Sequence, residues 1–354
     1  MKKILILLLV LSTILAFSYQ WEVFPGFFKP LKNLGMGGTY VTTSEGLGAL
    51  LLNPALYKGG FDLNSQIVMS NNVTILPKLF PVITNPASFT ELLTDSEFLN
   101  AMQGVHSYGM NFAVGYGANL LGFTIGGMGA LQADAFWNLS LLNPSNAELG
   151  AWAGYFGVLG ASFEILDGFK LGASVGGGMA GFLIPATATQ YPAKIDITAE
   201  DPFTGLLPDD PSKILQQINK PFFIASVGGI YELEGWRFGA SYFMTAPDIL
   251  NGTDFRGIFS GGLSYTWQFL TVAFEVEDIL NMEKTWLRKL NAGVETNFGF
   301  IKLFGGLHAG WLTGGLKLEI PFVNIGFVAY VYEYSNAAGL MGEQKYILTF
   351  DSKF

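Results

Sequence analysis

The side chains best suited to catalysis or metal binding are scarce in this sequence. His106 and His308 are its only histidines, and none of its 354 residues is a cysteine. Neither histidine stands beside a second His, a Cys or a spaced set of carboxylates, as a zinc site requires. A Ser-His-acid or Ser-His-Asn set around His308 stays open as an alternative, although no motif marks its serine. We therefore expect no enzymatic activity and no metal or other cofactor.

A glycine-rich motif near the N-terminus is the next candidate for a binding function. Residues 34–41 read Leu-Gly-Met-Gly-Gly-Thr-Tyr-Val, and an Asn-Pro-Ala sequence begins at Asn53. The glycines permit close backbone approach or a positive φ, and Asn53 can cap a short helical turn that Pro54 begins. The spacing is not that of the dinucleotide motif G-x-G-x-x-G, and no strand-helix unit surrounds it. We therefore do not expect a dinucleotide site.

The composition indicates that lipid is the solvent of much of this chain. Half of the residues are hydrophobic, 15% are aromatic, 13% are charged and 45 are glycine. A soluble domain is normally about one quarter charged and about 7% glycine. The formal charge of −9 disfavours nucleic acid as a partner and a strongly anion-selective pore.

The N-terminus has the pattern of a secretory signal peptide. Two lysines are followed by an apolar run from Ile4 to Ala16 and by Ala16-Phe17-Ser18, a small-x-small cleavage site. A retained membrane anchor is the alternative, but the run is short for a spanning helix and no basic stop-transfer segment follows. We expect residues 1–18 to be removed and the mature chain to begin at Tyr19.

Alternating strands dominate the chain from about residue 106. Residues 270–277 place Leu270, Val272 and Phe274 on one face and Thr271, Ala273 and Glu275 on the other. Residues 112–131 are long and apolar enough to suggest a helix, but their six glycines favour a hairpin. Strands of roughly ten residues separated by turns are typical of a transmembrane barrel. The expected fold is all-β, a transmembrane antiparallel β-barrel of about 14 strands.

Three regions depart from the strand pattern. Residues 19–60 are glycine-rich without alternation, residues 76–105 contain a helical stretch, and residues 183–221 are Pro-rich with a short helix expected at residues 211–218. Loops this long are usually functional or disordered, and their apolar content argues against disorder. Aromatic residues near strand ends fit interfacial girdles. These are Trp137, Trp152, Trp267, Trp286, Trp311 and residues 330–334.

The N-terminal motif, together with the C-terminal third, resembles a known family. Phe274-Glu-Val-Glu-Asp-Ile-Leu280 and Leu290-Asn-Ala-Gly-Val-Glu295 look like late hairpins of the FadL-like outer-membrane barrels, and the last strand alternates up to a terminal aromatic, Phe354. That family includes long-chain fatty-acid and hydrocarbon transporters and is related to PorV-like proteins. The resemblance implies a hatch at residues 19–60 inside a barrel of residues 61–354. The residues that match the hatch motif are Gly35, Met36, Gly37, Gly38, Asn53, Pro54 and Ala55.

The resemblance further implies transport of a hydrophobic small molecule, such as a long-chain fatty acid, across the outer membrane. Segments 76–105 and 183–221 would then be capture loops, and the apolar residues of the first are Phe89, Leu92, Leu93, Phe98 and Leu99. Four basic residues fall at the alternate strand positions that should face the lumen, where they could bind the carboxylate of a fatty acid. They are Lys170, Arg237, Lys302 and Lys317. Alternatively, they pair with carboxylates on neighbouring strands and brace the barrel.

Other partners and functions follow from the same resemblance. The expected partners are the lipid of the outer membrane and the barrel assembly machinery, which would contact the C-terminal strand ending in Phe354. A PorV-like protein-binding barrel, a structural barrel and a general porin remain alternative functions. No nucleic acid is expected.

Overall fold

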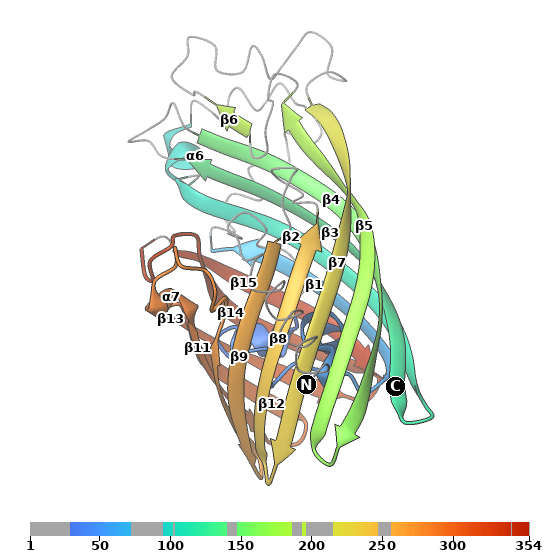
Figure 1. Ribbon diagram of the computed structural model, residues 1–354. Coiled ribbons are helices and arrows are strands. Elements are labelled where there is room, and N and C mark those ends of the chain that lie inside the picture. The colour runs from blue at the N-terminus through green and yellow to red at the C-terminus, as the bar shows by residue number, and fades with distance from the viewer. Residues whose placement is uncertain are drawn as a thin grey trace.

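Fourteen strands close into an antiparallel barrel. The computed structural model describes residues 29–71, 95–101, 103–139, 147–185, 193–195, 215–246, 256–340 and 342–353. Within these residues, fifteen strands form one sheet, which closes because β3 pairs with both β2 and β4 (Figure 1). The fifteenth strand, β6 (Ala193–Ile195), pairs only with the start of β4 and stands outside the closed ring. The expected barrel of about 14 strands is confirmed.

The strands lie in sequence order around the barrel. Their bounds are β1 Gly60–Ser70, β2 Gly104–Leu120, β3 Phe123–Leu139, β4 Ala147–Leu166, β5 Phe169–Pro185, β7 Leu215–Leu233, β8 Trp236–Ala246, β9 Arg256–Trp267, β10 Leu270–Val276, β11 Leu290–Asn297, β12 Ile301–His308, β13 Trp311–Ile320, β14 Val323–Glu333 and β15 Gly342–Lys353. β15 closes the ring on β1, with Ser65 opposite Phe350.

The alternation of residue types predicts the two faces of each strand correctly. On β10, Val272 and Phe274 are 49% and 42% exposed, whereas Ala273 and Glu275 are almost completely buried. The predicted hairpin is also confirmed, since β2 ends at Leu120 and β3 begins at Phe123 after a two-residue turn. Apolar side chains therefore cover the outside of the barrel, and small and polar ones line the lumen.

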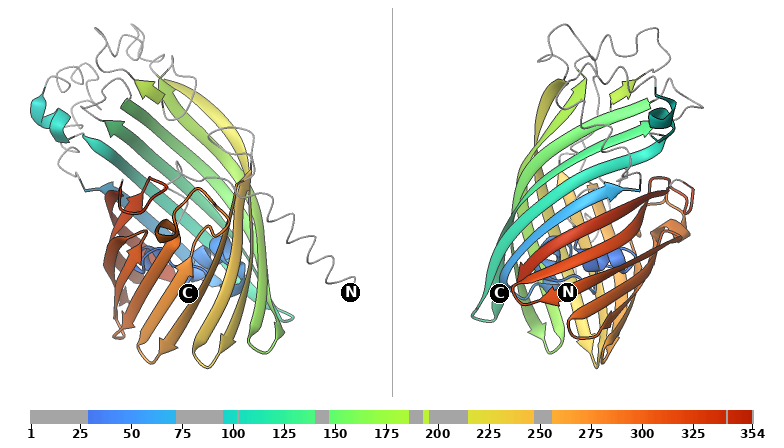
Figure 2. Two further views of the ribbon diagram at one scale, coloured as in Figure 1. Left: turned by 60° about the vertical axis from the view of Figure 1, so that its left-hand side comes forward. Right: turned by 180° about the vertical axis from the view of Figure 1, so that it is seen from behind.

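The barrel wall is of unequal height. β2, β3, β4, β5 and β7 have 17 to 20 residues, whereas β10 to β13 have 7 to 10. Because each residue adds about 3.3 Å, the long strands extend well beyond the short ones at one end of the barrel (Figures 1 and 2). At the other end, hairpins such as β2–β3 turn in two residues. We call these two ends the loop end and the turn end.

The helices are short. They are α2 (Leu31–Gly35), α3 (Gly46–Leu52), the 3₁₀ turn η1 (Pro54–Leu56), α6 (Ser96–Ala101) and α7 (Trp286–Lys289). None of the helices in the described ranges is both long and apolar enough to cross a membrane. α6 agrees with the helical stretch expected within residues 76–105.

Two expectations are wrong in part. Leu215–Ile218 belongs to β7, so the helix expected at residues 211–218 is replaced there by a strand, which pairs along its length with β5. Tyr330 and Tyr332 do not lie in a lipid girdle but on the lumen face of β14, where Tyr330 is 2% exposed. Trp152 also faces inward and is buried. The predicted signal peptide lies outside the described residues and stays a prediction.

Candidate functional site in the barrel lumen

Residues 29–59, which we call the N-terminal segment, lie inside the barrel near the turn end (Figures 1 and 2). α2 packs against β12, β13 and β14, and η1 packs on the opposite side against β4, β5 and β7. Leu31, Leu34 and Met36 share one apolar cluster with strand residues such as Phe304, and Leu50 and Leu51 belong to a second cluster with Ile224. The N-terminal segment thus crosses the lumen from wall to wall.

The α3–η1 part of the N-terminal segment folds as the Asn-Pro-Ala motif predicts. α3 is apolar all round and is buried from Leu47 to Leu52, because strands surround it. The carboxylate of Asp62 on β1 accepts the N–H of Leu47 at 3.1 Å and so supplies the missing helix cap. Asn53 Oδ1 accepts the N–H of Ala55 at 3.3 Å, and its Nδ2 donates to the carbonyl oxygen of Val41 at 2.5 Å. Pro54 and Ala55 are buried in the turn that follows.

The Gly-Met-Gly-Gly motif brings the N-terminal segment into backbone contact with the wall. Gly37 has φ +69°, and a Cβ at this position would lie 2.4 Å from the carbonyl oxygen of Ala292 on β11. Its N–H donates to Thr313 Oγ1 on β13 at 3.1 Å. Met36 is completely buried, and Gly35 packs against Phe304 of β12. Only glycine adopts this positive φ without strain and also leaves room for the carbonyl oxygen of Ala292.

Three side-chain anchors hold the N-terminal segment to β10, to the residue that directly follows β10, and to β11. One carboxylate oxygen of Glu275 accepts the N–H groups of both Tyr40 and Val41, at 2.7 and 2.8 Å. Lys32 pairs with Glu295 at 2.7 Å, and Lys29 pairs with Glu277 at 3.4 Å.

The Glu277 carboxyl is ionised despite its position inside the barrel. Burial by itself raises the pKa of this carboxyl, but Lys29 and the other basic side chains around it outweigh burial and lower the pKa to about 2. The carboxylate that faces Lys29 therefore carries its negative charge at neutral pH.

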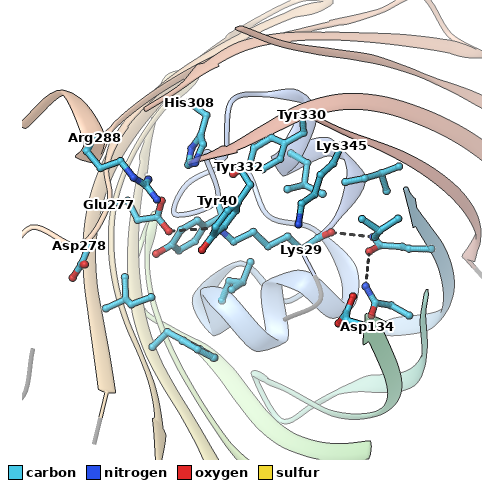
Figure 3. Close-up of a pocket in the computed structure, with 18 of the residues that line it drawn as sticks. Lys29, Tyr40, Asp134, Glu277, Asp278, Arg288, His308, Tyr330, Tyr332 and Lys345 are labelled. Atoms are coloured by element: carbon cyan, nitrogen blue, oxygen red, sulfur yellow. Dashed lines mark hydrogen bonds and ion pairs between the residues drawn. The ribbon is translucent and has the colours of Figure 1, made fainter. Parts of the chain in front are cut away.

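Two cavities lie on opposite sides of the N-terminal segment. The cavity toward the loop end has a volume of about 110 Å³ and is lined by Lys29, Leu34, Tyr40 and Leu52 of the segment, together with strand and loop residues (Figure 3). The cavity toward the turn end has a volume of about 330 Å³ and is lined by residues 55–58 and by the ends of β2 to β5. The N-terminal segment therefore separates two compartments of the lumen.

The loop-end cavity combines apolar walls with charges that are already matched. Its apolar side chains come from several elements and include Val68 on β1, Phe243 on β8 and Ile347 on β15. Its basic residues are each engaged: Lys29 with Glu277 at 3.4 Å, Lys284 with Asp278 at 3.0 Å, Lys345 with Glu343 at 3.3 Å, and Arg288 with the carbonyl oxygens of Glu333 and Ser335. The part of the chain that the structure describes holds no cluster of three potential metal ligands.

The four basic residues singled out by parity do face the lumen, but none lines the loop-end cavity. Lys170 and Arg237 both pair with Glu232, at 3.0 and 2.8 Å, beside the turn-end cavity. Lys302 pairs with Glu319 at 2.8 Å and Lys317 with Asp351 at 2.9 Å. This arrangement matches the bracing alternative, and contact with substrate stays a prediction.

Most of the predicted capture surface lies outside the described residues. Phe89, Leu92 and Leu93 fall in that part of the chain, as does the side chain of Leu99. Phe98 lies on α6 and is completely buried.

Sequence reasoning missed most residues of the loop-end cavity. Tyr330 and Tyr332 were assigned to lipid because aromatic residues near strand ends are typical of girdles, and Lys284 and Arg288 lie in a connection between β10 and β11 that shows no alternation. Parity could have placed the tyrosines inside, since both share the register of the buried Val328 on β14.

This architecture defines a class: a transmembrane barrel of fourteen strands whose lumen contains its own N-terminal segment. No family model and no curated protein sequence matches the chain. Among solved structures it is similar to the Pseudomonas putida toluene transporter TodX, with a TM-score of 0.56 and 10% identity over 94% of this chain and 100% of that one.

The Ralstonia pickettii toluene transporter TbuX aligns with a TM-score of 0.52 and 14% identity over 92% of this chain and 98% of that one. The TodX deltaS2S3 mutant, described as a monoaromatic hydrocarbon channel, aligns with a TM-score of 0.55 and 12% identity over 92% and 99%. At these identities the comparisons establish the fold alone: the expected transmembrane barrel is confirmed, and the resemblance to FadL-like barrels agrees with it at the level of fold.

Proposed function

We propose that this protein transports small hydrophobic molecules across the outer membrane and that its N-terminal segment is a hatch. The candidate cargo classes are long-chain fatty acids, from the sequence resemblance, and monoaromatic hydrocarbons, from the similarity in fold to toluene transporters. Removal of the signal peptide 1–18 and capture by the loops at 76–105 and 183–221 belong to the same proposal. Assembly through the C-terminal strand ending in Phe354 and direct contact of outer-membrane lipid with the barrel complete it.

The observation that carries the proposal is the placement of the N-terminal segment between two cavities. A barrel of fourteen strands without a plug leaves an open lumen, whereas here Leu47, Leu50 and Met36 are buried against strands on both sides. The cavity on the loop side has mainly apolar walls, which lower the free energy of a hydrophobe leaving water by about 0.8 kcal/mol per CH₂ group. A binding pocket closed by a movable segment is what such a transporter requires.

A general porin fits this lumen poorly, because ion flow needs a continuous water-filled path. A PorV-like protein-binding role depends on where the apolar residues of 76–105 point, and most of these lie outside the described residues. Neither alternative is favoured by a particular contact in the structure.

A reversible tether of the N-terminal segment tests the proposal. Gly35 and Phe304 are suitable positions for paired cysteines, since a Cβ at Gly35 would lie 2.7 Å from Phe304 Cβ, about 1 Å closer than in a typical disulfide. The sequence has no native cysteine, so only the introduced cysteines can form a disulfide. The matched control pairs Gly160→Cys with Ser174→Cys, which have the same 2.7 Å separation but join β4 to β5 without fastening the N-terminal segment. Because a Cβ at Gly160 would also lie 2.8 Å from Leu50 Cδ1 of the segment, each oxidised pair is compared with its own reduced form.

The readout is uptake of labelled toluene and labelled palmitate by cells that carry each variant in the outer membrane. We expect the oxidised Gly35→Cys/Phe304→Cys protein to lose uptake and to regain it on reduction, while the control pair is insensitive to redox state. Large single-channel conductance by the wild-type chain, or uptake equal to that of cells without the protein, would refute the proposal.

A further inference from the structure

Among the described residues that line the loop-end cavity, three carry a buried polar atom without a hydrogen-bond partner. One of these atoms is Oδ1 of Asn111 on β2, and the other two lie on neighbouring rings: Nε2 of His308, at the end of β12, and the phenol oxygen of Tyr330, on β14. Both residues are 2% exposed and both line the cavity. Their ring centroids lie 4.9 Å apart, and Figure 3 shows the Tyr330 ring extending toward His308. An unpaired polar group in such a place is costly, so it calls for an explanation.

The hydrogen bonds around His308 determine which role Nε2 has. Nδ1 lies 2.8 Å from Asn291 Oδ1. The amide of Asn291 is oriented in turn because its Nδ2 donates to Glu277 Oε2 at 3.2 Å. Nδ1 therefore carries the hydrogen of the neutral ring, and Nε2 presents a lone pair. Tyr330 supplies a hydroxyl hydrogen beside it, so the two groups form an acceptor and a donor on neighbouring rings.

We propose that His308 Nε2 and the Tyr330 hydroxyl form a subsite for the hydroxyl group of a small neutral hydrophobe, such as a phenol. The ligand O–H would donate to His308 Nε2, and the ligand oxygen would accept from Tyr330. The inference rests on the proposed function, because it specifies the cargo that the loop-end cavity prefers.

The surroundings of the subsite match the rest of such a ligand. Leu34 of the N-terminal segment and Ile347 of β15 pack in one cluster with Tyr330, and Val68 and Tyr332 border that cluster. A ring would thus meet apolar side chains on several sides. The volume of about 110 Å³ is close to the roughly 150 Å³ of an apolar cavity that holds a single benzene ring.

The charges of the cavity argue against a carboxylate in the same place. Lys29, Lys284 and Lys345 already pair with acidic side chains, and Arg288 donates to two backbone carbonyls. A carboxylate ligand would have to displace one of these partners, and it could not donate a hydrogen to His308 Nε2. A neutral hydroxyl satisfies both unpaired atoms without breaking any existing pair.

The test measures equilibrium binding of toluene and three of its para-substituted derivatives to the refolded mature chain in detergent. The ligands are toluene, 4-methylphenol, 4-methylanisole and 4-methylbenzoate, and each affinity is corrected for the partition of that ligand into micelles. The variants are Tyr330→Phe, which removes only the hydroxyl, and the control Tyr346→Phe on the neighbouring strand β15, where the Tyr346 ring stacks on the exposed Phe327.

We expect Tyr330→Phe to weaken 4-methylphenol binding about three- to tenfold, the range for one net hydrogen bond, and to leave toluene unchanged. Tyr346→Phe should change the affinity for neither ligand, since Tyr346 does not line the cavity. In the wild-type chain 4-methylanisole, which lacks the donor, should bind no better than toluene, and this comparison remains decisive even if a variant fails to fold.

The subsite is refuted if Tyr330→Phe affects toluene and 4-methylphenol equally, if the methyl ether matches the phenol, or if 4-methylbenzoate binds more tightly than 4-methylphenol. Saturable toluene binding alongside any of these results would leave the proposed function standing. Absence of saturable binding by every ligand would remove the proposed function and the subsite together.

Discussion

A methyl group added at Gly172 should loosen the N-terminal segment without harming the barrel. Gly172 lies on the lumen face of β5, and a Cβ there would be 2.3 Å from both the N atom of Ala55 and the carbonyl carbon of Pro54. Ordinary contacts of this kind measure 3.4–4 Å. The η1 turn must therefore retreat by about 1 Å, and overpacking of this size typically costs about 1–3 kcal/mol.

This cost falls on the docking of the N-terminal segment, because the obstructing atoms all belong to Pro54 and Ala55. Ser44→Cys supplies a reporter, since Ser44 is 4% exposed and the chain has no other cysteine. If labelling by a maleimide requires opening of the segment, a cost of about 1–3 kcal/mol accelerates it about 5- to 150-fold. The assay compares labelling rates of the folded protein in detergent micelles.

The matched control is Gly157→Ala on the neighbouring strand β4. Its new methyl would face outward, with the nearest heavy atom, the carbonyl oxygen of Met128, at 3.6 Å. Labelling of Ser44→Cys should be unchanged in this background. Equal rates in the Gly172→Ala and Gly157→Ala proteins, both still folded, would refute the idea that strand glycines make room for the segment.

Three further expectations concern polar and charged side chains. Glu275→Leu removes the acceptor that holds two N–H groups of the N-terminal segment, and because leaving a buried donor unpaired costs about 1–3 kcal/mol, labelling of Ser44→Cys should accelerate about fivefold or more; an unchanged rate contradicts the anchor. The pKa of Glu277 is lowered from 4.5 to about 2, so its ion pair stabilises docking fully above about pH 4.5 and loses this contribution as the pH falls toward 2. Pepsin cleavage within residues 29–59 should therefore rise across that window in the wild type and much less in Glu277→Gln, and the same rise in both proteins would exclude Glu277 as the cause. Lys317→Met leaves the buried Asp351 carboxylate without its cation, so the thermal unfolding temperature of the barrel should fall while toluene binding stays the same; a selective loss of binding would instead favour a substrate role for Lys317.

Local periodicity accounts for most of what could be predicted. Which face of β10 meets lipid follows from the types of Val272, Ala273, Phe274 and Glu275 alone, because side chains on a strand alternate with a period of two. The Asn53 cap and the Gly37 conformation are equally local, and both agree with the motif. The predicted helix at residues 211–218 failed over Leu215–Ile218 because pairing with β5 determines a strand there despite the weak local pattern.

Residue type was misleading where lipid and lumen favour the same side chains. Tyr330 is an aromatic residue near the end of a strand, as girdle residues are, yet its register on β14 turns its side chain inward. Trp152 was misassigned for the same reason. In such cases strand parity is a better guide than amino-acid type, because parity is a geometric property of the backbone.

The sequence by itself determined a lipid-exposed β-barrel, the number of its strands to within a small error, and the N-terminal motif that suggested a segment inside it. Only the tertiary structure decided which strands rise above the others, which carboxylate each lumen cation meets, and that His308 and Tyr330 lie together beside an apolar cavity. The reason is physical. Alternation and capping depend on neighbours in the chain, whereas the contents of a closed lumen depend on strands brought together from opposite ends of the sequence, as β1 and β15 are.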